Sequence, residues 1–180
     1  MRRELLLAGA GGQGIILAGV ILAEAAVRQG LFAAQSQAYG PQSRGGATKA
    51  EVVISDREVL YPRVERPDLI LLLSREAYGH YGQDVPATAR LVVDSSFVSD
   101  PAPGVLSVPI TETVREKLKR IIVANMAALG LVGALAGVVE RSYLEEAVRG
   151  RVPRGTAEIN LEALGLGYQM AQRFMGVPGC

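Results

Sequence analysis

The stretch that most constrains the fold of this chain is residues 5–17, which read LLLAGAGGQGIIL. An apolar run ends in glycines spaced Gly-x-Gly-x-x-Gly, and a long apolar helical pattern follows at once. The spacing predicts a strand, a tight turn and a helix, with Gly11 and Gly14 leaving room for another group beside the main chain. The unpaired N–H groups and positive dipole end of that helix would suit a phosphate. A helix start that only packs tightly on a strand is the alternative.

Further along the chain, apolar runs of strand length alternate with helical patterns. We expect strands at residues 4–8, 31–36, 49–55, 68–73, 90–93 and 104–108, and helices at residues 13–29, 75–81, 111–120, 121–139, 141–149 and 158–175. This alternation predicts the α/β class: a three-layer, Rossmann-like, mostly parallel sheet with helices on both faces. The length of 180 residues fits one domain, residues 1–180.

Residues 121–139 form a long segment without a charge, with cations before it and charged residues after it. Its length would suit a membrane span. However, Asn125, three glycines and few large side chains favour a helix that is buried in this domain or against a partner. Gly133 and Gly137 lie four residues apart, so we expect another backbone to approach the helix there.

Composition excludes several function classes. The net charge of +1 gives no electrostatic case for binding nucleic acid. The only cysteine is Cys180 and the only histidine is His80, so no cluster for iron–sulfur or zinc is expected within the chain. The pattern of a signal peptide is missing as well, and we expect a cytoplasmic protein. We find no catalytic constellation and predict neither catalytic nor metal-binding residues.

A second unusual stretch is residues 36–46, which read SQAYGPQSRGG. Arg44 stands between Ser43 and a Gly-Gly pair, so its guanidinium could donate two hydrogen bonds while the backbone folds close to a ligand. An ordinary loop with a solvated Arg44 is the alternative. This loop and the glycine turn each follow a strand, and if those strands are neighbours both lie on one rim of the sheet. Lys49, which begins the next strand, is interpreted as a solvated lysine at an edge.

Three phosphate-bearing ligands could suit the glycine turn. A site for NAD requires an acid about twenty residues further on, at the end of the second strand. Residues 33–37 read AAQSQ and contain no acid, so NAD is disfavoured. NADP stays open, because Arg44 could meet a 2′-phosphate. Coenzyme A also fits, since its own thiol carries the chemistry and the protein need only hold and orient it.

At these two loops the sequence resembles the gamma subunit of the 2-oxoacid:ferredoxin oxidoreductases. The matching stretches are residues 9–14, 39–46, 50–55, 125–130 and 160–163. They cover nearly the whole chain in length and order, and the pair of glycine-rich motifs is specific. The 2-oxoglutarate type is the most similar, while the pyruvate, branched-chain and indolepyruvate types stay open.

The resemblance implies a division of labour among subunits. The whole enzyme decarboxylates a 2-oxoacid on thiamine diphosphate, passes electrons through iron–sulfur clusters to ferredoxin, and transfers the acyl group to coenzyme A. The gamma chain is then an α/β domain that helps to bind coenzyme A. The expected partners are alpha and beta subunits that hold thiamine diphosphate and Mg²⁺, and a ferredoxin-like delta subunit. The iron–sulfur clusters are also expected on partner chains.

Carried over by position, the resemblance implies a set of coenzyme A contacts in the two loops and the later helices. These residues are Gly9, Gly11, Gly12, Gln13, Gly14, Ser43, Arg44, Asn125 and Asn160. For Asn125, a buried side chain that binds a backbone group is the alternative. Two other functions stay open for the whole chain: a free-standing NADP-binding reductase, and a structural subunit without a ligand whose apolar helix contacts a partner.

Overall fold

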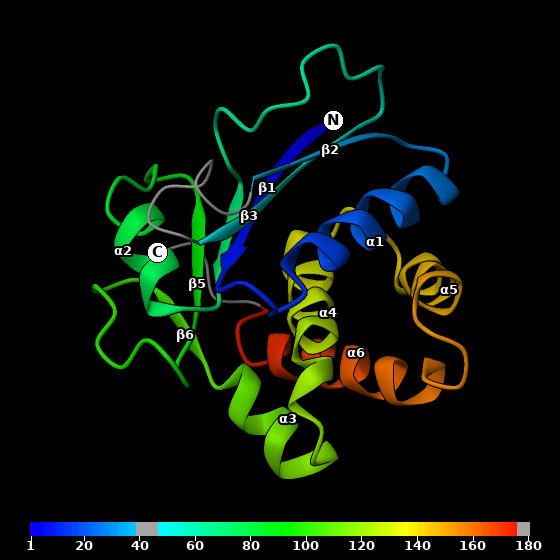
Figure 1. The fold of residues 1–180 in the computed structure, drawn as a ribbon. Helices are drawn as coiled ribbons and strands as arrows, with labels where there is room; N and C mark the ends of the chain where they lie inside the picture. Colours follow the sequence, from blue (N-terminus) through cyan, green and yellow to red (C-terminus); the bar gives the residue numbers. More distant parts are fainter. Residues whose placement is uncertain (39–46, 176–180) are drawn as a thin grey trace.

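The structure, a computed structural model, describes residues 1–38 and 47–175. These residues contain six strands and six α-helices; the strict alternation expected from the sequence holds only in part, since β2, β3 and β4 follow one another directly and α3 to α6 close the chain without a strand between them (Figure 1). The strands are β1 (Arg2–Gly9), β2 (Phe32–Ala38), β3 (Thr48–Ser55), β4 (Leu69–Leu72), β5 (Arg90–Asp94) and β6 (Leu106–Val108). The helices are α1 (Ile15–Arg28), α2 (Arg75–Tyr81), α3 (Ile110–Leu118), α4 (Ala124–Ala136), α5 (Arg141–Arg151) and α6 (Ala157–Ala171).

The strands form one mixed sheet in the order β2-β3-β1-β4-β5-β6. β1, β4, β5 and β6 run parallel to one another, whereas β3 runs antiparallel to both of its neighbours, β2 and β1. The predicted α/β class is confirmed, with one strand reversed in an otherwise parallel sheet. β1 and β2 are therefore not neighbours, yet both end at the rim where β3 begins, because Gly9 lies opposite Thr48 and Ala38 lies opposite Lys49.

The two faces of the sheet are covered unequally. One face packs against α1 and α4, and α5 and α6 pack in turn on these two helices. Their apolar side chains join those of alternate strand residues in one core that also includes α3 (Figure 1). On the other face a smaller cluster gathers under α2 and the loops beside it. Since successive strand residues point to opposite faces, β1 contributes Leu5 and Leu7 to the larger core and Leu6 and Ala8 to the smaller one.

The apolar segment 121–139 is shorter as a helix than its sequence predicts. A single 3₁₀ turn, Ile121–Val123, precedes α4, and Gly137 ends the helix with φ +60°. No helix among the described residues is long and apolar enough to cross a membrane. The close backbone approach expected at Gly133 and Gly137 occurs instead at Gly130, where a Cβ would collide with the carbonyl of Leu164 in α6.

Candidate functional site

The glycine turn lies between the end of β1 and the start of α1, as the sequence predicts. Gly12 and Gly14 have φ of +86° and +72°, a region that side-chain-bearing residues rarely adopt. Gly11 and Gly12 are exposed, and a Cβ built on either would meet nothing within 4 Å among the described residues. Two of these glycines thus set the path of the turn, and open space lies beside Gly11 and Gly12.

The side chain of Gln13 holds the turn together. Its Oε1 accepts a hydrogen bond from the N–H of Ala10 at 2.6 Å, and its Nε2 donates to the carbonyl of Leu73 at 2.9 Å. Gly9 leaves room for this amide, because a Cβ on Gly9 would collide with Gln13 Oε1 and lie 3.2 Å from Ile15. The structure therefore gives Gln13 a role in shaping the turn, and its contact with a ligand stays a prediction.

The first turn of α1 presents unpaired backbone donors. Gly14 is the N-cap and supplies no side chain, while its carbonyl accepts from the N–H of Ala18 at 3.0 Å. Within residues 1–38 and 47–175, the N–H groups of residues 15–17 have no hydrogen-bond partner. The first turn of α1 also contains no acidic residue. Free N–H groups at a helix start, with no carboxylate beside them in that turn, favour an anion.

Asn125 is brought to the glycine turn from a distant part of the chain. It lies in the first turn of α4, is 7% exposed, and its Nδ2 donates to the carbonyl of Gly14 at 3.4 Å. A Cβ on Gly14 would lie only 2.9 Å from Asn125 Cγ. The structure thus joins two of the predicted residues, and it also matches the alternative in which Asn125 binds a backbone group.

Asn160 is not gathered at the turn. It is buried in the first turn of α6, and its Nδ2 donates to the carbonyl of Thr156 at 2.8 Å. α6 runs antiparallel to α4, since Gly130 meets Leu164 and Gly167 meets Ala127. Asn160 accordingly lies toward the end of α4 that is far from Asn125. Ser43 and Arg44 lie outside the described residues.

The rim also contains a polar cluster that the sequence analysis missed. The Glu51 carboxylate, 5% exposed, accepts from Ser36 Oγ at 2.8 Å and from Lys49 Nζ at 2.7 Å. The prediction that Lys49 is solvated is wrong, because this ion pair and the ring of Tyr81, 5.8 Å from Nζ, leave its side chain 18% exposed. The available signal was the spacing of Lys49 and Glu51, which places both on one face of a strand.

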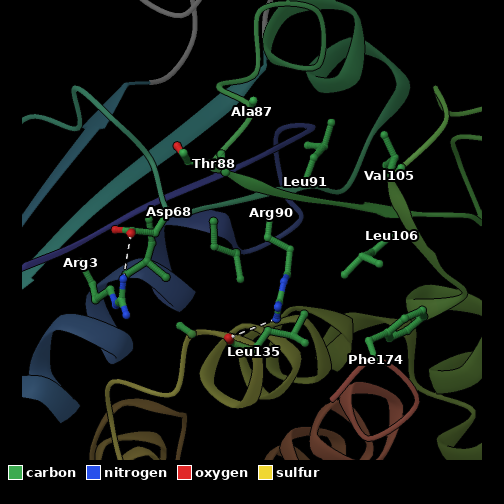
Figure 2. Close-up of a pocket in the computed structure, with 15 residues that line it drawn as sticks. Arg3, Asp68, Ala87, Thr88, Arg90, Leu91, Val105, Leu106, Leu135 and Phe174 are labelled. Atoms are coloured by element: carbon green, nitrogen blue, oxygen red, sulfur yellow. Dashed lines mark hydrogen bonds and ion pairs between the residues drawn. The ribbon is translucent and has the colours of Figure 1, made fainter. Parts of the chain in front are cut away.

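A cavity of about 540 Å³ lies at the opposite edge of the sheet, where β1, β4 and β5 begin (Figure 2). Arg3 pairs there with Asp68 at 3.0 Å, and Arg90 extends toward the carbonyl of Leu135 at the end of α4, 3.5 Å away. Ligands of open α/β sheets bind beyond the carboxyl ends of the strands. The glycine turn is at that end and the cavity is not, so the turn is the better candidate site.

Comparison with known proteins decides the family. Residues 4–170 match the family model of pyruvate ferredoxin/flavodoxin oxidoreductases. The chain belongs to this family. The 2-oxoglutarate synthase subunit KorC of Methanocaldococcus jannaschii is 44% identical in an alignment that covers 96% of this chain and 95% of that one. The KorC of Methanothermobacter marburgensis is 42% identical over 94% of this chain and 97% of that one.

Solved structures of oxidoreductases share the fold. The gamma subunit of a keto/oxoacid ferredoxin oxidoreductase from Geobacter sulfurreducens PCA matches with a TM-score of 0.84 and 42% identity, covering 95% of this chain and 99% of that one. A 2-oxoglutarate:ferredoxin oxidoreductase from Magnetococcus marinus, with 2-oxoglutarate, coenzyme A and succinyl-CoA bound, matches with a TM-score of 0.85 and 24% identity. That match covers 99% of this chain and 32% of the other, and it shows the fold alone.

The family resemblance inferred from the two glycine-rich loops is therefore confirmed. The chain is a gamma-type subunit of a 2-oxoacid:ferredoxin oxidoreductase, and the 2-oxoglutarate type is indeed highly similar to it. The location of iron–sulfur clusters on partner chains stays a prediction, made because the sequence has one cysteine. Within the part of the chain that the structure describes, no group of His, Cys, Asp and Glu could hold a metal ion.

Proposed function

We propose that this chain binds the phosphate groups of coenzyme A at the glycine turn, as part of a cytoplasmic 2-oxoglutarate:ferredoxin oxidoreductase. The substrate assignment is supported by relatives named 2-oxoglutarate synthase subunit, which match this chain over nearly their full length. Thiamine diphosphate, Mg²⁺ and the iron–sulfur clusters then lie on the alpha, beta and ferredoxin-like subunits, and ferredoxin accepts the electrons.

The observation that carries the proposal is the start of α1. Within residues 1–38 and 47–175 its first N–H groups have no partner, and the turn before it leaves open space beside Gly11 and Gly12. A diphosphate can accept hydrogen bonds from such groups while the helix dipole stabilises its charge. Two side chains hold this geometry: Asn125 binds the carbonyl of Gly14, and Gln13 binds the carbonyl of Leu73 at the end of β4.

In this account the chain supplies no reacting group. Coenzyme A carries its own thiol, which takes the acyl group formed on the partner subunits. The glycine turn binds the nucleotide end, and the thiol end must extend to the partner. Binding of this non-reacting part then anchors the coenzyme equally in the ground state and in the transition state, which lowers the KM without changing kcat.

The proposal is tested by Gly11→Ala in the assembled enzyme. The added methyl group meets no described atom and the backbone there needs no positive φ, so the fold should tolerate it. It would occupy space that a phosphate needs, and we expect the KM for coenzyme A to rise about tenfold with kcat nearly unchanged, as for lost uniform binding. The matched control is Gly79→Ala in α2, which also points into open space but on the other face.

Two results would contradict the proposal. One is an unchanged KM for coenzyme A in Gly11→Ala, which would favour a structural subunit without a ligand. The other is saturable binding of NADPH by the purified chain, followed by fluorescence and weakened by Gly11→Ala. That binding would favour the reductase alternative, in which Arg44 meets the 2′-phosphate.

A further inference from the structure

The cavity at the amino ends of β1, β4 and β5 is large enough to hold a small organic molecule. Its volume of about 540 Å³ falls within the range of about 300–1,000 Å³ that is typical of small-molecule sites. It lies at the edge of the sheet opposite the glycine turn (Figure 2). A ligand bound here would therefore be separate from a ligand at the turn.

The walls of this cavity are mostly apolar and come from both layers of the fold. Strand residues Leu5, Leu69 and Leu106 line it from the sheet, while Leu135 in α4 and Phe174 after α6 line it from the helical layer. Leu5 and Leu69 also belong to the larger core, so the cavity reaches the edge of that core. Water finds few hydrogen-bond partners against such walls, and an apolar chain is therefore the favoured occupant of this part.

Among the described residues, the charged groups of the lining leave one positive charge without an ion pair. These groups are two cations, Arg3 and Arg90, and one anion, Asp68. The Asp68 carboxylate accepts from Arg3 Nη1 at 3.0 Å and from the N–H of Glu4 at 2.8 Å, so Arg3 and Asp68 offset each other. Arg90 forms no ion pair in that part of the chain. The remaining positive charge favours an anion that carries a single charge.

Arg90 is held by its backbone at a place where its side chain can meet a ligand. Its N–H donates to the carbonyl of Asp68 at 2.9 Å, and its side chain extends from β5 toward α4 among the other lining residues (Figure 2). There Nη1 lies 3.5 Å from the carbonyl of Leu135, which is long for a hydrogen bond. A guanidinium has five N–H donors, and a pair of them matches the two oxygens of a carboxylate.

We propose that this cavity binds a small organic monocarboxylate, with the carboxylate on Arg90 and the hydrocarbon chain against the leucines. A phosphate ester with two charges is disfavoured, because the lining offers one net positive charge. An uncharged ligand would leave the guanidinium of Arg90 with only the carbonyl of Leu135 as a partner in the described part of the chain. The proposal does not depend on the coenzyme A site, since the glycine turn lies at the opposite edge of the sheet.

The experiment titrates the full chain with sodium butanoate, hexanoate and octanoate, and with 1-hexanol as the uncharged reference. The partner subunits are left out, because an oxoacid site there would also bind carboxylates. Isothermal titration calorimetry gives each Kd, which should fall up to about tenfold for each two methylene groups added, since these become buried. Hexanol should bind at least about tenfold more weakly than hexanoate, because it cannot form the charge-assisted hydrogen bonds. Methyl NMR signals of Leu106 and Leu135 should shift on binding.

Three variants test the two parts of the site. Arg90→Met removes the charge and keeps an apolar stem, so the Kd for hexanoate should rise at least about tenfold. Arg75→Met is the matched control, because Arg75 is exposed at the start of α2 on the other face of the sheet, and the Kd should stay unchanged. Ala136→Leu, at the end of α4, adds atoms to the lining and keeps the charge of Arg90. It should weaken the binding of octanoate more than that of butanoate.

The outcomes decide between a ligand site and an arginine that serves only the end of α4, where a cation offsets the helix dipole. The second role is left, and the proposal overturned, if no carboxylate binds or if Arg90→Met binds hexanoate as tightly as the unaltered chain. Hexanol that binds as tightly as hexanoate overturns it as well, and so does hexanoate that shifts the signals of residues 10–17 instead of Leu106 and Leu135. Should Arg90→Met fail to fold, an unchanged Kd for octanoate in Ala136→Leu overturns the proposal.

Discussion

The side-chain amide of Asn125 donates a hydrogen bond to the carbonyl oxygen of Gly14, joining the first turn of α4 to the start of α1. The contact spans 111 residues of sequence and is mostly buried. It requires glycine at position 14 for two reasons, since φ is +72° and a Cβ would press against the Asn125 side chain. The anion-binding geometry of the turn therefore depends on the packing of a different helix.

Gly14→Ala should destabilise the fold. Strain at a left-handed position and the collision with Asn125 together should lower the free energy of unfolding by about 2–4 kcal/mol, measured by chemical denaturation. Adding Asn125→Ala removes the collision but not the strain, so the double variant should recover part of the loss. Gly11→Ala is the control and should change stability by no more than about 0.5 kcal/mol, because it meets open space. Equal stability of both single variants would contradict the described geometry.

Lys49→Met should also destabilise the fold, because the buried carboxylate of Glu51 would lose the cation that pairs with it. Among the described residues Glu51 would then keep Ser36 as its close partner, with Arg63 at 3.8 Å. A buried carboxylate that loses its closest cation costs about 3 kcal/mol or more. The double variant Lys49→Met with Glu51→Gln removes that charge and should be more stable than the single one. A double-mutant cycle that shows simple additivity would mean that the two residues are not coupled.

Gly130→Ala should disrupt the contact between α4 and α6. A Cβ there would strike the carbonyl of Leu164, a backbone atom that cannot turn aside. We expect a loss of about 3 kcal/mol or more in the free energy of unfolding, as for an overpacked core. Gly165→Ala in α6 is the control, because its nearest neighbour is the flexible end of Arg141 at 3.6 Å. That change should be neutral or stabilise the helix by up to about 1 kcal/mol.

The pairing of Glu24 with two arginines predicts a pH dependence. Hydrogen bonds from Arg151 and then Arg28 lower the pKa of the Glu24 carboxyl below 4.5, although burial opposes this. The folded state thus keeps the carboxylate ionised to a lower pH than the unfolded chain does. Its contribution to stability is fully present above about pH 4.5 and is lost as the pH falls through the lowered pKa.

Glu24→Gln should accordingly lower the melting temperature at neutral pH and have a smaller effect near pH 3. Thermal unfolding across that range checks the prediction, with the exposed Glu146→Gln in α5 as the control. A melting-temperature difference between Glu24→Gln and the unaltered chain that stays constant with pH would contradict the role assigned to the ion pairs.

The elements that the sequence predicts well are those set by local chemistry. The glycine turn could be located because Gly12 and Gly14 adopt a backbone that few other residues reach, and apolar runs marked the buried strands. Gly137 ends α4 because glycine adopts the left-handed backbone of a helix end. The sequence analysis extended this helix to residue 139 because it considered only the run of uncharged residues. Family motifs then located the candidate site.

The features that the sequence analysis missed depend on register and on distant contacts. The reversed direction of β3 and the Ser36–Glu51–Lys49 cluster exist only when β2 and β3 pair in one register. The start of α3 is held by Asp94 at the end of β5, which accepts from the N–H groups of Ile110 and Thr111. Apart from the spacing of Lys49 and Glu51 within one strand, no local pattern encodes such pairings. The family motifs predict that Asn125 and Asn160 both contact the ligand. The antiparallel packing of α6 on α4 instead places Asn125 at the glycine turn and Asn160 toward the far end of α4.

The central claim is that the start of α1 binds coenzyme A, and hydrogen exchange in the assembled enzyme tests it most directly. Amide exchange of residues 10–17 is compared with and without coenzyme A, using peptides from α2 as the internal reference. The account predicts slower exchange at Gly11, Gly12 and residues 15–17 when coenzyme A is bound, with α2 unchanged. Saturating coenzyme A that leaves residues 10–17 unprotected while protecting another part of the enzyme would contradict it.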